Sequence, residues 1–136
     1  MRPLFEKVAV PPGSSWTLLD RRLEDGIPFQ WHYHPEFELT LTLNSRGQRY
    51  IGDSVAPYDD GDLVLLGPNL PHTWCSAERI SPDGPHVALV MWFTQGWADS
   101  VTAAHPNHAA DSLRSASHAT CHNSAPPAAP RPSSTR

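Results

Sequence analysis

The sequence predicts an all-β fold, a sandwich or barrel, for residues 1–97. Up to about Gly96, short apolar or alternating runs are separated by segments rich in Gly, Pro, Asn and Asp, which is typical of short strands joined by turns. Over the same residues no apolar repeat of 3.6 residues lasts beyond one or two turns, so long helices are not expected. The 136 residues suit a single domain with a buried core.

Six segments have the character of strands, because each is apolar or alternating and ends at turn residues. The segment 62–67 is a nearly continuous apolar run, as expected of a strand buried on both faces. The predicted strands are residues 15–21, 28–34 continuing into 36–44, 48–52, 62–67, 71–77 and 86–94. The predicted turns are residues 44–47, 56–62, 67–71 and 81–85.

The segment 31–44, "WHYHPEFELTLTLN", has the clearest alternation. Side chains at every second position of a strand point to the same side of the sheet. One side would therefore carry two imidazoles and two carboxylates, and the other side would carry apolar residues. The polar set is His32, His34, Glu36 and Glu38, and the apolar set is Phe37, Leu39, Leu41 and Leu43. Trp31 and Tyr33 are expected to point away from the histidines.

Residues 98–136 have a different composition, with no aromatic residue and much Ala, Ser and Pro. Such a segment buries too little apolar surface to offset its ordering entropy, so we expect a largely disordered tail, with a short helix over 108–117 at most. A second hypothesis is that the tail is an out-of-frame or truncated product of a GC-rich gene. Four histidines lie here at irregular spacing, and we interpret them as incidental: His105, His108, His118 and His122.

Charge and cysteine content limit the function classes. The net charge of −4 and the lack of a basic cluster argue against direct binding of nucleic acid, which depends on neutralising phosphates. Cys75 and Cys121 lie far apart, which favours reduced thiols over a disulfide scaffold. The N-terminus has no signal-peptide core, and the longest apolar run, 87–93, is too short to cross a bilayer. We therefore expect a cytoplasmic protein without membrane contact.

A further histidine, His72, begins a strand after the buried run of "GDLVLLGPNLPHTW", residues 61–74. In an antiparallel barrel this strand and the strand bearing His32 and His34 can approach each other on the inside. His32, His34, Glu38 and His72 would then surround one ion. Imidazole with carboxylate suits Fe, Mn, Ni, Co, Cu or Zn rather than Ca or Mg. Two linked motifs indicate such a site more strongly than one histidine pair does.

These two segments resemble the two cupin motifs. The first motif resembles Gly26, His32, His34 and Glu38, and the second resembles Gly61 and His72. The match departs from the family pattern at Ser45, where the first motif closes on glycine, at residues 67–69 in place of Pro-x-Gly, and at Ser76 in place of Asn. The resemblance implies a cupin-like double-stranded β-helix, a jelly-roll barrel. It also implies a site for one divalent transition metal (Fe, Mn, Ni or Zn) at His32, His34, Glu38 and His72.

The residues within and around the two motifs are also similar to the N-terminal effector domain of AraC-type bacterial regulators, over residues 5–95. That resemblance implies a sensor that binds a small molecule, a sugar or organic acid, in the barrel. DNA is bound in that family by a domain with two helix-turn-helix motifs, which no segment here resembles. Exposed apolar strand faces are compatible with a homodimer. Further candidates for ligand contacts are Glu36, Thr40 and Trp74.

The same residues are compatible with two other functions. A free-standing cupin enzyme, of dioxygenase or isomerase type, would use the same four ligands and leave positions for substrate or O₂. A β module that only dimerises is the weaker alternative. Nucleophilic catalysis finds no support, because no Gly-x-Ser-x-Gly occurs and Cys75 has no evident activating partner.

Overall fold

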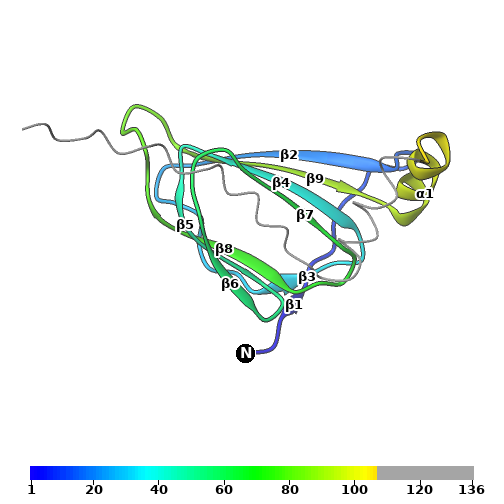
Figure 1. The fold of residues 1–136 in the computed structure, drawn as a ribbon, viewed down its shortest axis with the longest axis horizontal. Coiled ribbons are helices and arrows are strands. Elements are labelled where there is room, and N and C mark those ends of the chain that lie inside the picture. The colour runs from blue at the N-terminus through cyan, green and yellow to red at the C-terminus, as the bar shows by residue number, and fades with distance from the viewer. Residues whose placement is uncertain (107–136) are drawn as a thin grey trace, which may run out of the picture.

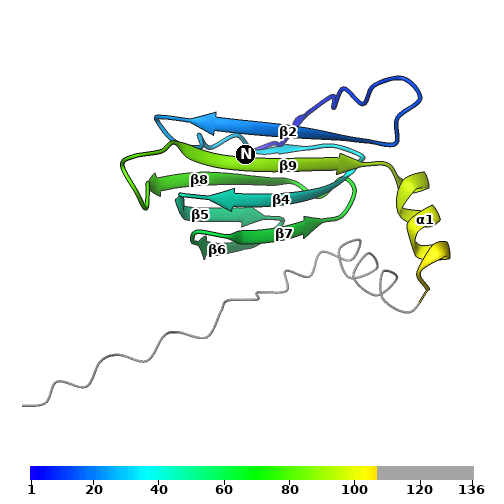
Figure 2. The same cartoon turned by 90° about the horizontal axis from the view of Figure 1, so that it is seen from above.

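A computed structural model describes residues 1–106 as two β-sheets that face each other, with one helix at the edge (Figures 1 and 2). The all-β prediction is confirmed for this part of the chain. The strands are β1 (Leu4–Phe5), β2 (Trp16–Leu23), β3 (His32–Tyr33), β4 (Phe37–Leu43), β5 (Arg46–Ile51), β6 (Ser54–Tyr58), β7 (Asp62–Leu66), β8 (His72–Glu78) and β9 (His86–Phe93), and the helix is α1 (Gln95–Ala104).

The two sheets form the layers of a jelly-roll barrel. One sheet has the strand order β1-β3-β8-β5-β6 and the other has the order β2-β9-β4-β7. All pairings are antiparallel except that of β1 with β3. Figure 1 shows the sheets as two layers, and the chain crosses between them at each end. This closure places residues from distant parts of the sequence on a common interior.

The prediction of one continuous strand over residues 31–44 is wrong. The segment divides into β3 and β4, which belong to different sheets. Pro35 lies at the break, where it lacks a backbone N–H and restricts the conformation of His34. His32 therefore approaches the interior from one sheet, and Glu38 approaches it from the other.

Two strands were not predicted. β6 overlaps the predicted turn 56–62 and contains Pro57, which a strand tolerates at the edge of a sheet. β6 pairs only with β5, so the missing N–H of Pro57 breaks no second ladder. β1 has only two residues, and its parallel pairing with β3 depends on a contact between segments far apart in the sequence.

Helix α1 corrects the expected start of the tail at residue 98. Thr94 caps the helix, since its side-chain oxygen accepts a hydrogen bond from the backbone N–H of Trp97 at 3.2 Å. Ala98 is 2% exposed and packs with Phe37 and Phe93 on the outer side of the sheet. Residues 98–104 are therefore part of the fold. The rest of the predicted tail, with its helix over 108–117, lies outside the described residues.

Strand β4 shows which way the alternating pattern faces. Glu38, Thr40 and Thr42 are 3%, 2% and 0% exposed, so the polar side of the strand points into the barrel. Leu39 packs on the other side, against the cluster that α1 covers. Within the described part of the chain, no helix has the length and apolar character that a membrane span requires. The interior is thus partly polar, and the candidate site lies in it.

Candidate metal centre

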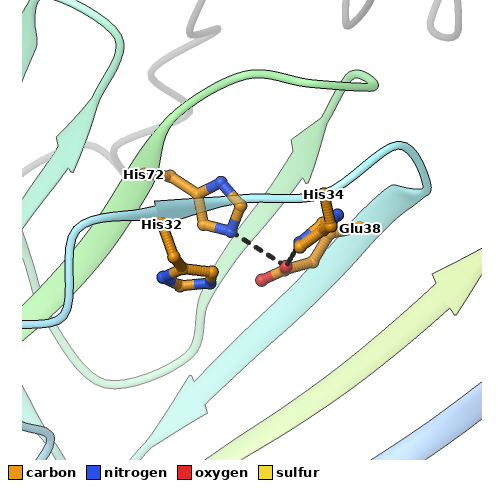
Figure 3. Close-up of side chains that lie close together, drawn as sticks. All are labelled: His32, His34, Glu38 and His72. Atoms are coloured by element: carbon orange, nitrogen blue, oxygen red, sulfur yellow. Dashed lines mark hydrogen bonds and ion pairs between the residues drawn. The ribbon is translucent and has the colours of Figure 1, made fainter. Parts of the chain in front are cut away.

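The four predicted ligands converge inside the barrel (Figure 3). One ligand atom from each of His32, His34, Glu38 and His72 lies within 4.8 Å of the other three. His34 and His72 are 1% exposed and Glu38 is 3% exposed, whereas His32 is partly open to solvent. Burial of three such polar groups is costly unless each has partners, so the contacts that they make decide what the cluster can do.

Strand pairing and one turn bring the histidines together. His32 on β3 lies directly opposite His72 on β8 in the antiparallel ladder. The turn before His72 is fastened to the first motif, because the N–H of Asn69 donates to the carbonyl of His34 at 2.7 Å. Asn69 has φ +59°, a left-handed conformation that Asn adopts more readily than most residues. The departure from Pro-x-Gly in the second motif is therefore accommodated by asparagine.

Each of the three imidazoles has its Nδ1 within hydrogen-bond distance of a backbone carbonyl. A ring that donates from Nδ1 to a carbonyl keeps its lone pair on Nε2 when neutral, and this arrangement orients histidines in metal sites. The acceptors are the carbonyl of Gln30 for His32 (2.5 Å), of Glu36 for His34 (3.1 Å) and of Leu70 for His72 (2.7 Å). The backbone thus prepares three Nε2 atoms as ligands.

Glu38 lies at the centre of the cluster. Its Oε2 accepts hydrogen bonds from Nε2 of His34 (2.7 Å), Nε2 of His72 (3.0 Å) and Nε1 of Trp92 (3.1 Å). Its Oε1 accepts a hydrogen bond from the hydroxyl of Thr40 at 2.6 Å. Burial by itself would raise the pKa of Glu38, but the bonds from His34 and His72 hold it well below its ordinary value. Glu38 is therefore a carboxylate surrounded by donors.

The pKa values of His34 and His32 are shifted in opposite directions. Burial would lower the pKa of His34, but the hydrogen bond and charge of Glu38 outweigh burial and raise it. Burial lowers the pKa of His32, and the neighbouring His72 adds to that effect. Nε2 of His32 lies 3.2 Å from the carboxylate of Glu6, which β1 brings to the cluster. No local pattern around Glu6 signals this contact, because it depends on pairing with a strand far along the chain.

A cavity of about 990 Å³ adjoins the cluster, and His32 and Glu38 form part of its wall. Of the other predicted ligand contacts, Thr40 and Trp74 line this cavity. Glu36 does not, because it precedes β4, and its carboxylate lies 3.7 Å from Nδ1 of His34 instead. The structure therefore places Glu36 beside a ligand of the cluster and not beside the space that a small molecule would fill.

Two aromatic residues differ from the sequence-based expectation. The predicted strand 86–94 carries no predicted contact with the cluster, yet the indole N–H of its Trp92 donates a hydrogen bond to Glu38 and the ring lines the cavity. Trp31 was expected to point away from the histidines, and it lines the cavity as well. Trp92 lies opposite Glu38 in the β4–β9 ladder, so its role follows from register. A sequence without known pairing gives no signal for that contact.

The donor set fits a divalent transition metal. Three imidazole nitrogens and one carboxylate suit iron, manganese, nickel or zinc, whereas calcium and magnesium prefer oxygen ligands throughout. The hydrogen bonds that now link Glu38 to His34 and His72 show that the ligand atoms already face one another. Binding a cation would replace the protons shared in these bonds, as expected when a metal competes with protons for the same ligands.

Solved structures of similar shape were found, while no family model and no curated protein matches the sequence. A variant of oxalate decarboxylase from Bacillus subtilis is 17% identical with a TM-score of 0.50, over 73% of this chain and 30% of that chain. A cupin 2 conserved barrel domain protein from Salinispora arenicola CNS-205 is 18% identical with a TM-score of 0.48, over 74% of this chain and 82% of that one. The fold is the predicted cupin-like jelly-roll barrel.

Proposed function

We propose that the barrel holds one divalent transition metal at His32, His34, Glu38 and His72, and a small organic molecule in the adjoining cavity. We further propose that it serves as the effector-binding domain of an AraC-type transcriptional regulator. One observation supports the metal and ligand site most directly. Three Nε2 atoms, oriented by backbone carbonyls, and a buried carboxylate converge at the wall of a cavity of about 990 Å³.

The residues around the metal site would have different roles. A bound metal would supply a positive charge that attracts an oxygen atom of the small molecule. The carbonyls behind His34 and His72 fix the two rings, so little ordering is needed when the metal binds. Thr40 and Trp92 hold the carboxylate of Glu38 in place through hydrogen bonds. Burial of Glu38 keeps water away from this side of the site.

The sensor proposal is supported by the resemblance over residues 5–95 and by the acidic net charge of −4. An effector changes an equilibrium only by binding two states of a protein unequally. Contact with DNA would belong to a separate domain. A homodimer is a further part of the proposal, because the outer face of the four-stranded sheet leaves Trp16, Leu18 and Leu63 about half exposed or more.

An enzyme is the second candidate, and one observation favours it. His32 and Glu38 face the cavity, so a molecule there would lie next to the metal with both ligands at the boundary. Dioxygenase or isomerase chemistry would need this access together with open coordination positions. Fold likeness does not separate an enzyme from a sensor, since one fold hosts many functions.

The test is a cobalt(II) titration of the full chain followed by visible absorbance, with Glu38→Gln and, as matched control, His105→Ala. His105 lies at the exposed end of α1, away from the cluster. We expect one cobalt per chain, lost in the Glu38 variant and kept in the control. Equal binding by both variants would contradict the metal site. Oxygen uptake or sugar-phosphate isomerisation by the iron- or manganese-loaded chain would favour the enzyme over the sensor.

A further inference from the structure

The floor of the cavity is the inner face of β2, β9 and β4, and its side chains change in character along the strands. At the metal end, Glu38 lies beside Trp92. Four residues further along, the wall carries a cation. The inner rows are Glu38 with Trp92, then Thr40 with Val90 and Leu19, then Thr42 with Ala88 and Arg21. At about 3.3 Å per residue, the backbone rows of Glu38 and Arg21 are about 13 Å apart.

Some polar groups of this wall have hydrogen-bond partners within the protein, and others have none. The hydroxyls of Thr40, Thr42 and Thr73 already donate hydrogen bonds, to Glu38 Oε1, the carbonyl of Asp62 and the carbonyl of Trp74 respectively. Within residues 1–106, several polar groups of the wall have no protein partner, among them the guanidinium of Arg21 and the buried Nε1 of Trp74. Both are donors and neither accepts a hydrogen bond. A ligand that satisfies them must bring acceptors.

The charge of the cavity wall is opposite to that of the chain. Three cationic side chains line it, whereas its two carboxylates, Glu6 and Glu38, are both held by histidines of the cluster. The three cations are Arg2, Lys7 and Arg21. In a chain of net charge −4, a wall with more cations than free carboxylates attracts an anion. Arg21 is the one of the three that lies on the barrel floor and is not in the N-terminal segment.

From these contacts we infer that the molecule bound in the cavity is an organic acid with an apolar body, whose carboxylate is held by Arg21. The inference rests on the proposed function and narrows its ligand class. The wall between Arg21 and the metal end is mostly apolar: it is formed by Leu19, Val90 and Trp92, with Thr40, whose hydroxyl already donates to Glu38. A guanidinium binds a carboxylate through two parallel hydrogen bonds. Arg21 and Nε1 of Trp74 offer donors alone, which suits a carboxylate better than a sugar, whose hydroxyls both donate and accept.

The test measures binding of phenylacetate and of its neutral analogue phenylacetamide to the full chain by calorimetry. The variants are Arg21→Gln and, as matched control, Arg22→Gln. Arg22 is the next residue of β2, is exposed, and pairs with Asp20 at 3.3 Å. We expect phenylacetate to bind the wild type and the control alike, and to bind the Arg21 variant at least about tenfold more weakly. The amide should bind all three proteins equally weakly.

Several outcomes would overturn the inference: equal binding of acid and amide, no saturable binding of the acid, or no effect of Arg21→Gln. Tighter binding of glucose than of the acid would also overturn it. Phenyl phosphate in place of the acid distinguishes a phosphate ligand, and preference for it would replace the carboxylate assignment. Cobalt binding, measured in parallel, is expected to be unchanged in the Arg21 variant. If the wild-type chain bound no cobalt, the metal site would be refuted. The effect of Arg21→Gln on phenylacetate binding would still test the carboxylate site separately.

Discussion

Two polar clusters lie at opposite ends of β4, and they differ in how their donors and acceptors are arranged. Around Glu38, near the start of the strand, two imidazoles, an indole and a hydroxyl all donate to one carboxylate. Beyond its end, Ser45 bonds the hydroxyl of Tyr58 at 2.9 Å and Nδ1 of His86 at 2.8 Å. Both clusters contain buried histidine, so burial alone does not mark a functional site.

The two clusters differ in whether several ring nitrogens converge on one carboxylate, and in whether the cluster is accessible from the cavity. The Ser45 cluster links groups that can both donate and accept, and Ser45 is fully buried. The Glu38 cluster gathers an excess of ring nitrogens around one acceptor and forms part of a cavity wall. A small cation can take the place of shared protons only in the second arrangement. We therefore interpret the Ser45 cluster as structural and the Glu38 cluster as a binding site.

The largest expected contrast comes from removing one histidine from each cluster. Loss of a residue that only orients a metal ligand weakens metal binding about 10- to 100-fold. His72→Ala removes a ligand itself, so it should weaken cobalt binding by more than that while the chain stays folded. His86→Ala should leave cobalt affinity within about twofold and lower the free energy of unfolding by about 1–3 kcal/mol. Cobalt titration and urea unfolding of both variants measure this. Loss of cobalt binding in the His86 variant would erase the distinction between the clusters.

A smaller effect is expected from Ser45→Ala. This change leaves the Tyr58 hydroxyl and Nδ1 of His86 without their shared partner, at a cost of about 1–3 kcal/mol in the free energy of unfolding. The control is Ser54→Ala, on the exposed edge strand β6, which should change stability by less than about 0.5 kcal/mol. Urea unfolding of the metal-free chain compares the two. Equal stability of the variants would show that the Ser45 cluster contributes nothing.

The smallest expected effect is a difference in the sign of pH dependence, measured by thermal melts of the metal-free chain between about pH 5.5 and 7.5. Burial lowers the pKa of His86, and Arg79 adds to it, so the stability it contributes is present above about pH 6.5 and lost as the pH falls. The raised pKa of His34 has the opposite consequence, since its contribution is present below about pH 6.5 and lost as the pH rises.

Single substitutions separate these two contributions. His86→Gln should reduce the loss of Tm on acidification, whereas His34→Gln should increase it, because the stabilising protonated form of His34 is then missing. Glu38 stays ionised across this pH range, since its pKa is held well below the ordinary value. A shift of the same sign in both variants would contradict the assigned pKa directions.

The candidate ligands could be predicted from the sequence because the two motifs hold them at fixed spacings. Alternation and the second motif predict His32, His34, Glu38 and His72, and the structure brings the four together. The geometry that does so was not predicted. Pro35 divides the segment, and Glu36 therefore lies outside the cavity wall although it shares the even phase of Glu38. Phase predicts a face only within one unbroken strand.

The contacts that complete both clusters were beyond sequence reasoning. Glu6 and Trp92 reach the Glu38 cluster through the pairings of β1 with β3 and of β9 with β4, and Arg21 reaches the cavity wall through the pairing of β2 with β9. Ser45 stands where the first motif closes on glycine, and its partners Tyr58 and His86 come from two other strands. Such roles depend on register between strands, which a single sequence leaves open.

The sequence by itself determined an all-β chain with four metal-type side chains, since alternation, turn residues and motif spacing are local properties. Only the tertiary structure decided that His32 and Glu38 come from different sheets, that α1 extends the fold past residue 97, and that a cation-rich cavity adjoins the ligands. The reason is physical. Closing two sheets into a barrel assigns an inside and an outside to each strand, and that assignment depends on all the strands together.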